Sequence, residues 1–299
     1  MCTITRRSFL SGVLASPLSR LYAKGKAAID QTLIALVSDT HICGNETSTY
    51  QRTAYQRIVT HILSLNPLPG FVVNAGDYAF LFGKKCDYET ARHLTAPLEA
   101  AGIKVVIGMG NHDRRASFLE FNPQYAETTQ VPNRIVSVLE TPYVNFIMLD
   151  SCLEGPVGGA IDDDQADWLK TALTASRKPV IIGSHHDPFE LRMAPILQDC
   201  PAVAGYIYGH HHTWANRQIQ LNGKKKRLLQ AVCLPSTGHW GDIGFALMHT
   251  TADRAVVALH QHDYYTPRPL AKEKRPAAWD ERVKKNQGKM VCFELRCKV

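Results

Sequence analysis

The sequence predicts an α/β fold, and three observations support this class. Short apolar runs alternate with helix-period segments from residue 31 onward, the later part of the chain changes to strands alone, and 45% of the 299 residues are hydrophobic. That share is the one expected of a chain with an ordinary packed core. No stretch approaches the ~20 uninterrupted apolar residues of a membrane-spanning helix, so we expect no stable membrane insertion.

Five apolar runs are expected to be buried strands, because each is short and continuously apolar. Between the first two runs, the apolar residues from Tyr55 to Leu63 fall at helical spacing on one face, and residues 162–173 repeat this pattern. Strand and helix in turn predict an α/β domain. The five expected strands are residues 33–37, 71–73, 105–107, 180–182 and Val203–Tyr208.

Residues 135–139 and 143–149 are close enough in sequence to pair as neighbouring strands. After residue 213 strands alone are expected, and Asn222-Gly223 lies between two strand-like runs, which is a strong hairpin signal. The strands expected after residue 213 are residues 217–221, 227–232, 243–249 and 255–260.

The chain divides into a leader, one domain and a tail. Residues 1–23 form the expected leader, residues 24–265 the domain, and residues 266–299 a basic tail. The tail contains several prolines and many Lys and Arg residues up to Gly288, so we expect it to be extended and mobile.

The leader has the order of a processed export signal, with a basic start, a short apolar stretch and a small residue at its exit. Arg6 and Arg7 are followed by Ser8-Phe9-Leu10, which resembles the twin-arginine (Tat) signal of bacteria. That resemblance implies the Tat export machinery as a partner and the bacterial periplasm, or the exterior, as the destination. The formal charge of +7 includes three leader arginines, so the remaining charge is too diffuse to predict nucleic-acid binding.

Each of the five buried strands is followed at once by side chains that bind metals. The carboxyl ends of strands in an open α/β sheet lie together, so these residues are expected to converge. Their donors are oxygen and imidazole nitrogen without thiolate, which suits two divalent ions such as Mn, Fe, Zn or Co. The motifs are Asp39-Thr40-His41, Gly76-Asp77, Gly110-Asn111-His112-Asp113, His185-His186 and Gly209-His210-His211-His212.

This ordered set, read as D-x-H, G-D, G-N-H-D, a histidine and G-H-x-H, resembles the calcineurin-like metallophosphoesterases over roughly residues 33–250. Residues 159–161, followed by Gln165 and Trp168-Leu169, resemble a segment common in the cyclic-nucleotide phosphodiesterase branch. The resemblance implies a four-layer sandwich, in which two mixed β-sheets pack face to face and are flanked by helices. It also implies a dinuclear metal centre.

The resemblance assigns the predicted ligands as follows. Asp39, His41 and His212 would bind one metal ion, and Asn111, His185 and His210 the other. Asp77 would bridge the two ions, because a carboxylate offers an oxygen to each. The adjacent His185 and His186 are both candidate ligands. We favour His185, with His186 facing the cleft as a substrate contact or packing beneath it.

The resemblance also implies a mechanism. A hydroxide that bridges the two metal ions would attack phosphorus in line, because two cations lower the pKa of a shared water toward ~7. His112 would be the general acid that protonates the leaving oxygen, and Asp113 would orient its imidazole. Asn111 would contact the substrate phosphate, and His239 and Trp240, in a glycine-rich loop, are expected to line the cleft.

The predicted function is therefore an exported hydrolase of a small phosphoric ester. The segment at Gln165 and Trp168 favours a phosphodiester. One alternative is a phosphomonoesterase like the purple acid phosphatases, but these carry a tyrosine ligand, and Tyr78 should point away from Asp77 in an extended segment. Another alternative is a non-catalytic metal-binding module of the same fold, which the complete ligand set and His112 disfavour.

Overall fold

The computed structural model describes residues 27–44, 49–224, 226–265 and 277–295. The predicted leader, residues 1–23, lies outside this part of the chain. Among the described residues, no helix has both the length and the apolar character needed to cross a bilayer.

The first sheet has six strands in the order β12-β11-β10-β1-β2-β3. Strands β1, β2 and β3 run parallel. Strand β10 pairs antiparallel with β1, β11 with β10, and β12 with β11. The sheet is therefore mixed. Its strands are β1 (Ile29–Val37), β2 (Leu68–Asn74), β3 (Lys104–Ile107), β10 (Gly241–Thr250), β11 (Arg254–Tyr265) and β12 (Met290–Glu294).

The second sheet is also mixed and has the order β4-β5-β6-β7-β9-β8. Strands β5, β6, β7 and β9 run parallel, and the edge strands β4 and β8 are antiparallel to their neighbours. The pairing of β8 with β9 confirms the hairpin predicted at Asn222-Gly223. The strands are β4 (Ser137–Glu140), β5 (Asn145–Met148), β6 (Val180–Gly183), β7 (Val203–Tyr208), β8 (Ala215–Leu221) and β9 (Arg227–Cys233).

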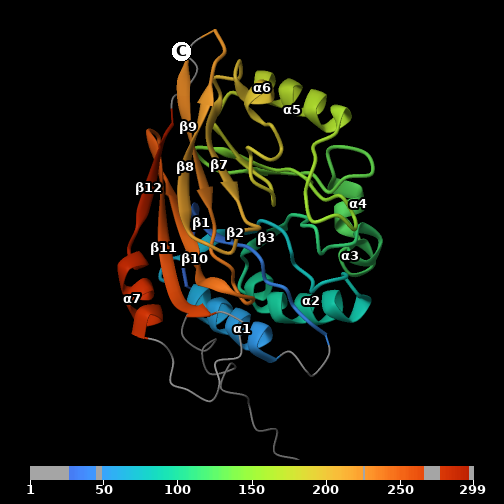
Figure 1. Cartoon of the computed structure of the whole chain (residues 1–299), viewed down its shortest axis with the longest axis vertical. Coiled ribbons are helices and arrows are strands. Elements are labelled where there is room, and N and C mark those ends of the chain that lie inside the picture. Colours follow the sequence, from blue (N-terminus) through green and yellow to red (C-terminus); the bar gives the residue numbers. More distant parts are fainter. Residues whose placement is uncertain (1–26, 45–48, 225, 266–276, 296–299) are drawn as a thin grey trace, which may run out of the picture.

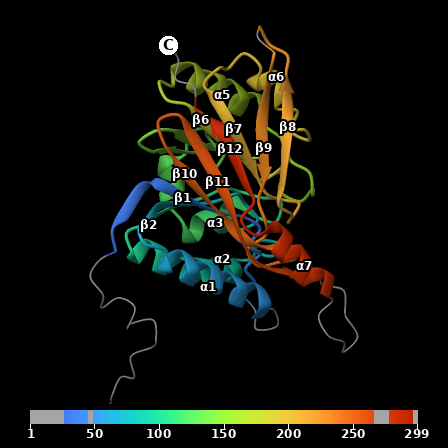
Figure 2. The same cartoon turned by 90° about the vertical axis from the view of Figure 1, so that its left-hand side faces the viewer.

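Helices cover the outer face of each sheet (Figures 1 and 2). Four of them pack on the first sheet, two on the second, and α7 packs against β11. The predicted four-layer order of helix, sheet, sheet and helix is thus confirmed. The helices are α1 (Thr49–Ser64), α2 (Lys85–Ala100), α3 (Arg115–Phe121), α4 (Gln124–Thr128), α5 (Asp163–Ala175), α6 (Ala194–Leu197) and α7 (Ala277–Asn286).

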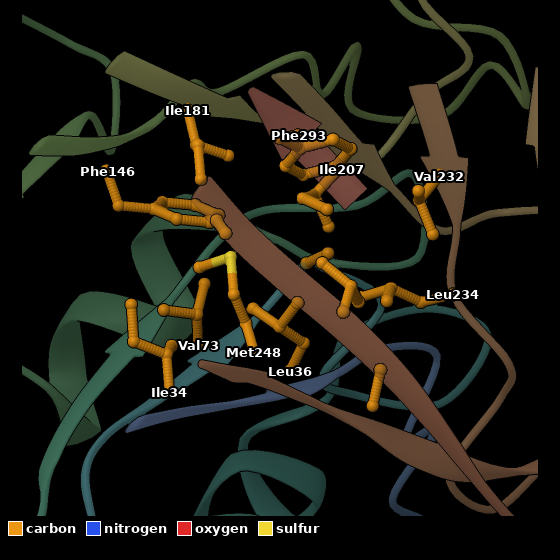
Figure 3. Packing of buried hydrophobic residues seen from close by; sticks show 14 of the residues in the cluster. Ile34, Leu36, Val73, Phe146, Ile181, Ile207, Val232, Leu234, Met248 and Phe293 are labelled. Carbon is orange, nitrogen blue, oxygen red and sulfur yellow. The ribbon is translucent and has the colours of Figure 1, made fainter. Parts of the chain in front are cut away.

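The alternation of side chains along the strands builds three apolar layers. In β1, Ile34 and Leu36 face the second sheet, whereas Ala35 and Val37 face the helices of the first. Because successive side chains of a strand point to opposite faces, one apolar strand serves two cores. Figure 3 shows the layer between the sheets, where side chains of both sheets interdigitate around Met248.

The expectation that residues 266–288 are extended is wrong for residues 277–286, which form α7. Residues 290–294 form the edge strand β12, while residues 266–276 and 296–299 lie outside the described residues. Val291 and Phe293 are buried between the more exposed Met290, Cys292 and Glu294, which is the period of a half-buried strand. The Phe293 ring fills the space left by the absent side chain of Gly205 on β7. Proline and charge in the preceding segment concealed this short alternating pattern.

Phe293→Ala tests whether β12 belongs to the core. Phe293 is 1% exposed, so removal of its ring should lower the free energy of unfolding by ~3–5 kcal/mol. Met290→Ala, on the same strand but 67% exposed, should change it by less than ~0.5 kcal/mol. Equal effects of the two variants in urea denaturation would contradict the packing of β12.

Candidate metal centre

The seven predicted ligands lie together where five strands end. Because β1, β2 and β3 are parallel, and β6 and β7 are parallel, each sheet delivers its ligands to one edge. Backbone hydrogen bonds hold the loops after β1 and β2 together: Asp39 donates to Gly76 and His41 donates to Asp77, both at 3.0 Å. The ligands are Asp39 and His41 after β1, Asp77 after β2, Asn111 after β3, His185 after β6, and His210 and His212 after β7.

Five of these seven residues have left-handed backbone conformations, with φ between 45° and 69°. A non-glycine residue with positive φ is uncommon, and such residues cluster at functional sites where the surrounding structure compensates their cost. The strain turns each side chain inward directly after its strand. The five residues are Asp39, His41, Asp77, His210 and His212.

The first group of donors consists of Asp39, His41 and His212. The Nε2 atom of His212 lies 3.2 Å from Oδ1 of Asp39 and 3.1 Å from Nε2 of His41. The three residues are buried, and their donor atoms lie within 4.8 Å of one another. Within the described part of the chain, the Nδ1 atoms of both histidines are buried without a hydrogen-bond partner.

The second group surrounds His185. Its Nε2 atom lies 3.2 Å from Oδ2 of Asp77, 3.2 Å from Oδ1 of Asn111 and 3.3 Å from Nδ1 of His210. Its Nδ1 atom lies 3.0 Å from the Ala75 carbonyl oxygen. Because this oxygen can only accept a hydrogen bond, the bond requires a proton on Nδ1. In the neutral ring, the Nε2 lone pair therefore faces the other donors of the group.

Asp77 connects the two groups. Its Oδ2 atom lies 3.2 Å from Nε2 of His185 and 3.6 Å from Nε2 of His41. Carboxylate oxygens and imidazole lone pairs lie close together here, and these groups repel one another. A cation bound between them would remove this repulsion. The residues present therefore fit a pair of divalent metal ions.

The ionisation states of Asp77 and His210 agree with this fit. Burial by itself raises the pKa of Asp77, but His185 and His41 hold that pKa well below its usual range, so the buried carboxylate is ionised. Burial, with a contribution from His185, lowers the pKa of His210 to about 4. His210 is therefore neutral at pH 7, and a neutral imidazole has a free lone pair for a metal ion.

Gly110 allows the loop after β3 to approach Asp77 closely. A Cβ atom at this position would overlap the Asp77 carboxylate and its backbone nitrogen. The backbone N–H groups on both sides of Asn111 are used here: Gly110 donates to Asp113 at 2.9 Å, and His112 donates to Oδ1 of Asp77 at 2.9 Å. The second of these bonds fixes the carboxylate that joins the two donor groups.

His112 points at the site, but Asp113 does not orient it. The Nδ1 atom of His112 lies 2.8 Å from the Leu81 carbonyl, and its Nε2 atom lies 3.9 Å from Oδ2 of Asp77. The Asp113 carboxylate is buried and instead accepts hydrogen bonds from the backbone of Tyr78, Ala79 and Gly110. The expected orienting role of Asp113 is therefore wrong, because its oxygens are used to brace the loop that carries Asp77.

His186 packs beneath the site. Its Nδ1 atom lies 2.8 Å from Oγ of Ser151, and its Nε2 atom lies 3.0 Å from the Val157 carbonyl. Both ring nitrogens are engaged and the side chain is buried, so His186 supports the loop of residues 151–159. Of the two predicted placements, facing the cleft or packing beneath it, the structure shows the second.

The glycine-rich loop lies against the first donor group. The ring centroid of His239 lies 4.3 Å from that of His41, and the ring of Trp240 lies 4.4 Å from that of His212. Trp240 is 40% exposed, so its ring forms part of the surface beside the donors. This position agrees with the predicted cleft wall.

Sequence reasoning missed a brace at the C-terminal helix. The Asp242 carboxylate is buried and accepts hydrogen bonds from Nε of Arg282 at 2.6 Å and from the Trp214 backbone at 2.9 Å. The backbone N–H of Asp242 donates to the His212 carbonyl at 2.9 Å. The position of His212 thus depends on α7. No spacing rule connects Arg282 to Asp242, since they come from separate elements.

The calcineurin-like phosphoesterase family matches residues 32–214, which contain all seven predicted ligands. This chain belongs to that family. Membership makes it a metal-dependent phosphoester hydrolase and implies a dinuclear metal centre.

Similar proteins agree with this assignment. The chain is 25% identical over 227 residues to the glycerophosphodiester phosphodiesterase GpdQ of Enterobacter lignolyticus, covering 69% of this chain and 78% of that protein. It is 25% identical over 205 residues to the 3′,5′-cyclic adenosine monophosphate phosphodiesterase CpdA of Pseudomonas aeruginosa, covering 62% and 71%. A dimetal phosphatase from Danio rerio shares the fold, with a TM-score of 0.59 at 18% identity over 77% of this chain and 96% of that one.

Gly110→Ala tests the contact with Asp77. The added methyl group should displace the Asp77 carboxylate, so the increase in melting temperature that Mn²⁺ gives the wild type over chelator should be lost. Gly205→Ala is the matched control, because its methyl group would meet Phe293 in the core and destabilise the fold without touching the donors. A variant of Gly110 that retains the full Mn²⁺ effect would contradict the geometry.

Proposed function

We propose that this enzyme hydrolyses a phosphodiester by in-line displacement at a pair of divalent metal ions. The single observation that carries the mechanism is Asp77, whose Oδ2 atom lies within 3.6 Å of a histidine of each donor group. The preference for a diester rests on the relatives at 25% identity, which are named as phosphodiesterases.

The two donor groups would each hold one ion. Asp39, His41 and His212 would bind the first, and Asn111, His185 and His210 the second, with Asp77 shared. Nitrogen and oxygen donors without thiolate suit Mn, Fe, Zn or Co. When bound, such a pair lowers the pKa of a shared water and stabilises negative charge on the phosphoryl oxygens.

The chain's own residues position the substrate and move the proton. The Leu81 carbonyl holds Nδ1 of His112, so Nε2 is left to donate a proton to the departing alkoxide as its bond to phosphorus breaks. Asn111 would donate from its amide nitrogen to a phosphoryl oxygen, and His239 and Trp240 would border the substrate.

A phosphomonoesterase with a tyrosinate ligand receives no support. The hydroxyl group of Tyr78 lies 2.8 Å from Oγ1 of Thr95 on α2, and its side chain is buried in the core beneath the first sheet. It points away from Asp77, as its position in the sequence predicts.

We also propose that the protein is exported in the folded state through the twin-arginine machinery. The support is the sequence Thr5-Arg6-Arg7-Ser8-Phe9-Leu10 followed by a weakly apolar stretch. Export after folding suits an enzyme whose site needs metal ions, because the ions are then acquired before the protein leaves the cytoplasm.

His112→Ala tests the general acid. The variant should keep its metal content and lose ~10²-fold or more in kcat on diesters with alkyl leaving groups, because an alkoxide needs protonation. The loss should be far smaller with p-nitrophenol as the leaving group. His93→Ala, an exposed histidine on α2, is the control and should match the wild type. An equal loss on both types of ester would remove the acid role.

Replacement of Arg6 and Arg7 by lysine tests export. In a bacterial host, the wild-type chain should appear in the periplasmic fraction in a shortened form, whereas the double variant should stay in the cytoplasm at full length. Immunoblots of the two fractions measure this. Periplasmic delivery of the double variant would refute the Tat route, though not the hydrolase.

A further inference from the structure

Exposed apolar side chains gather around the candidate metal centre. The described residues include ten exposed large hydrophobic side chains, and six of them belong to loops that border the site. We call these six the apolar collar. They are Leu81, Phe82, Leu153, Val157, Phe189 and Trp240.

Direct contacts connect the collar to the site. The Leu81 carbonyl accepts from His112, the Val157 carbonyl lies 3.0 Å from Nε2 of His186, and the Trp240 ring lies against His212. Phe189 follows the His185-His186-Asp187 motif by two residues. The collar therefore draws on loops from both sheets, and Leu81 connects it to His112 through the backbone.

The collar side chains are largely exposed to solvent. Phe82 and Val157 are 66% and 68% exposed, although an apolar side chain of this size gains free energy from leaving water. The other four exposed side chains, Ile29, Tyr143, Leu228 and Met290, lie on β1, the β4–β5 turn, β9 and β12, away from these loops. Single exposed apolar residues need no explanation, but a group of them around a site indicates a ligand surface.

We propose that the substrate is a phosphodiester with an alkyl or acyl chain, and that the collar binds this chain. This inference rests on the proposed function and specifies its substrate class. Leu81, Leu153 and Val157 have no hydrogen-bonding groups in their side chains, so they cannot read the polar edges of a nucleobase, but they suit a hydrocarbon chain.

A series of methyl, butyl and hexyl p-nitrophenyl phosphates, kept as monomers in solution, tests the proposal with the Mn²⁺-loaded enzyme. Full burial of a methylene group is worth ~0.8 kcal/mol, about fourfold in affinity. The collar covers a chain from some sides only, so kcat/KM should rise about twofold for each added methylene.

Phe82→Ser should reduce the ratio of the hexyl to the methyl kcat/KM at least threefold. Met290→Ser is the matched control, because Met290 is 67% exposed but lies outside the collar, and it should keep the wild-type ratio. A flat chain-length series in the wild type would overturn the collar as a binding surface, while turnover of the methyl ester would leave the proposed function standing. No turnover of any ester would overturn the proposed function and this inference with it.

The collar also has another conceivable occupant, a second copy of the chain. In that case the wild type would sediment as a dimer, Phe82→Ser would sediment as a monomer, and both would show a flat chain-length series. That set of results would overturn the proposal. A monomeric wild type with a rising series would support it.

Discussion

Two buried carboxylates in one site are the constraint on which the rest of this structure depends. Asp39 and Asp77 are each about 1% exposed or less, and both pKa values are held below their usual range by neighbouring histidines, although burial opposes this. Buried negative charge is costly unless it is paired. Histidine nitrogens meet these carboxylates from several directions, and a pair of cations is what makes the arrangement favourable. The positive φ angles and the close approach of Gly110 to Asp77 are locally unfavourable, and they occur where these carboxylates and histidines are brought together.

The relative position of the two sheets is part of the site. The backbone N–H of His210, after β7 of the second sheet, lies 3.1 Å from both carboxylate oxygens of Asp39, after β1 of the first. Each donor group therefore depends on the relative position of the two sheets. The apolar layer between the sheets holds them in that position. Arg282 on α7 extends the dependence to the end of the chain through Asp242 and the His212 backbone. A change in the packing of β12 or α7 is thus expected to alter the geometry of the metal centre even when no ligand is substituted.

The sequence predicts the strands, and it predicts that the candidate ligands lie together, because both are local signals. A buried strand followed by an acidic residue or a histidine occupies fewer than ten residues, and parallel strands bring such ends together. The residues that support the ligands were harder to identify. Asp113 follows His112 directly, yet its carboxylate turns to the backbone of Tyr78 and Ala79, which no spacing predicts. Helix α2 was missed although Tyr88, Ala91, Leu94 and Leu98 lie at helical spacing, because Pro97 and many polar residues weaken its pattern. Strand β12 was missed for a similar reason. Its five residues show too few alternations of buried and exposed side chains to indicate a strand beside a basic, proline-containing segment.

The site thus separates into an inner part that performs chemistry and an outer part that selects the substrate. The inner donors lie directly at the strand ends, where backbone hydrogen bonds and burial leave little freedom. The outer side chains lie farther along the same loops, where exposure lets them vary in size and polarity without disturbing the donors. Leu81 joins the two parts, because its carbonyl orients His112 while its side chain faces solvent at the rim. Replacement of that side chain changes the surface offered to a substrate, whereas the carbonyl that positions the acid is present whatever the residue. The chemistry of the centre and the choice of substrate are therefore physically separable in this fold, even though fewer than ten residues of one loop connect Asp77 to the collar.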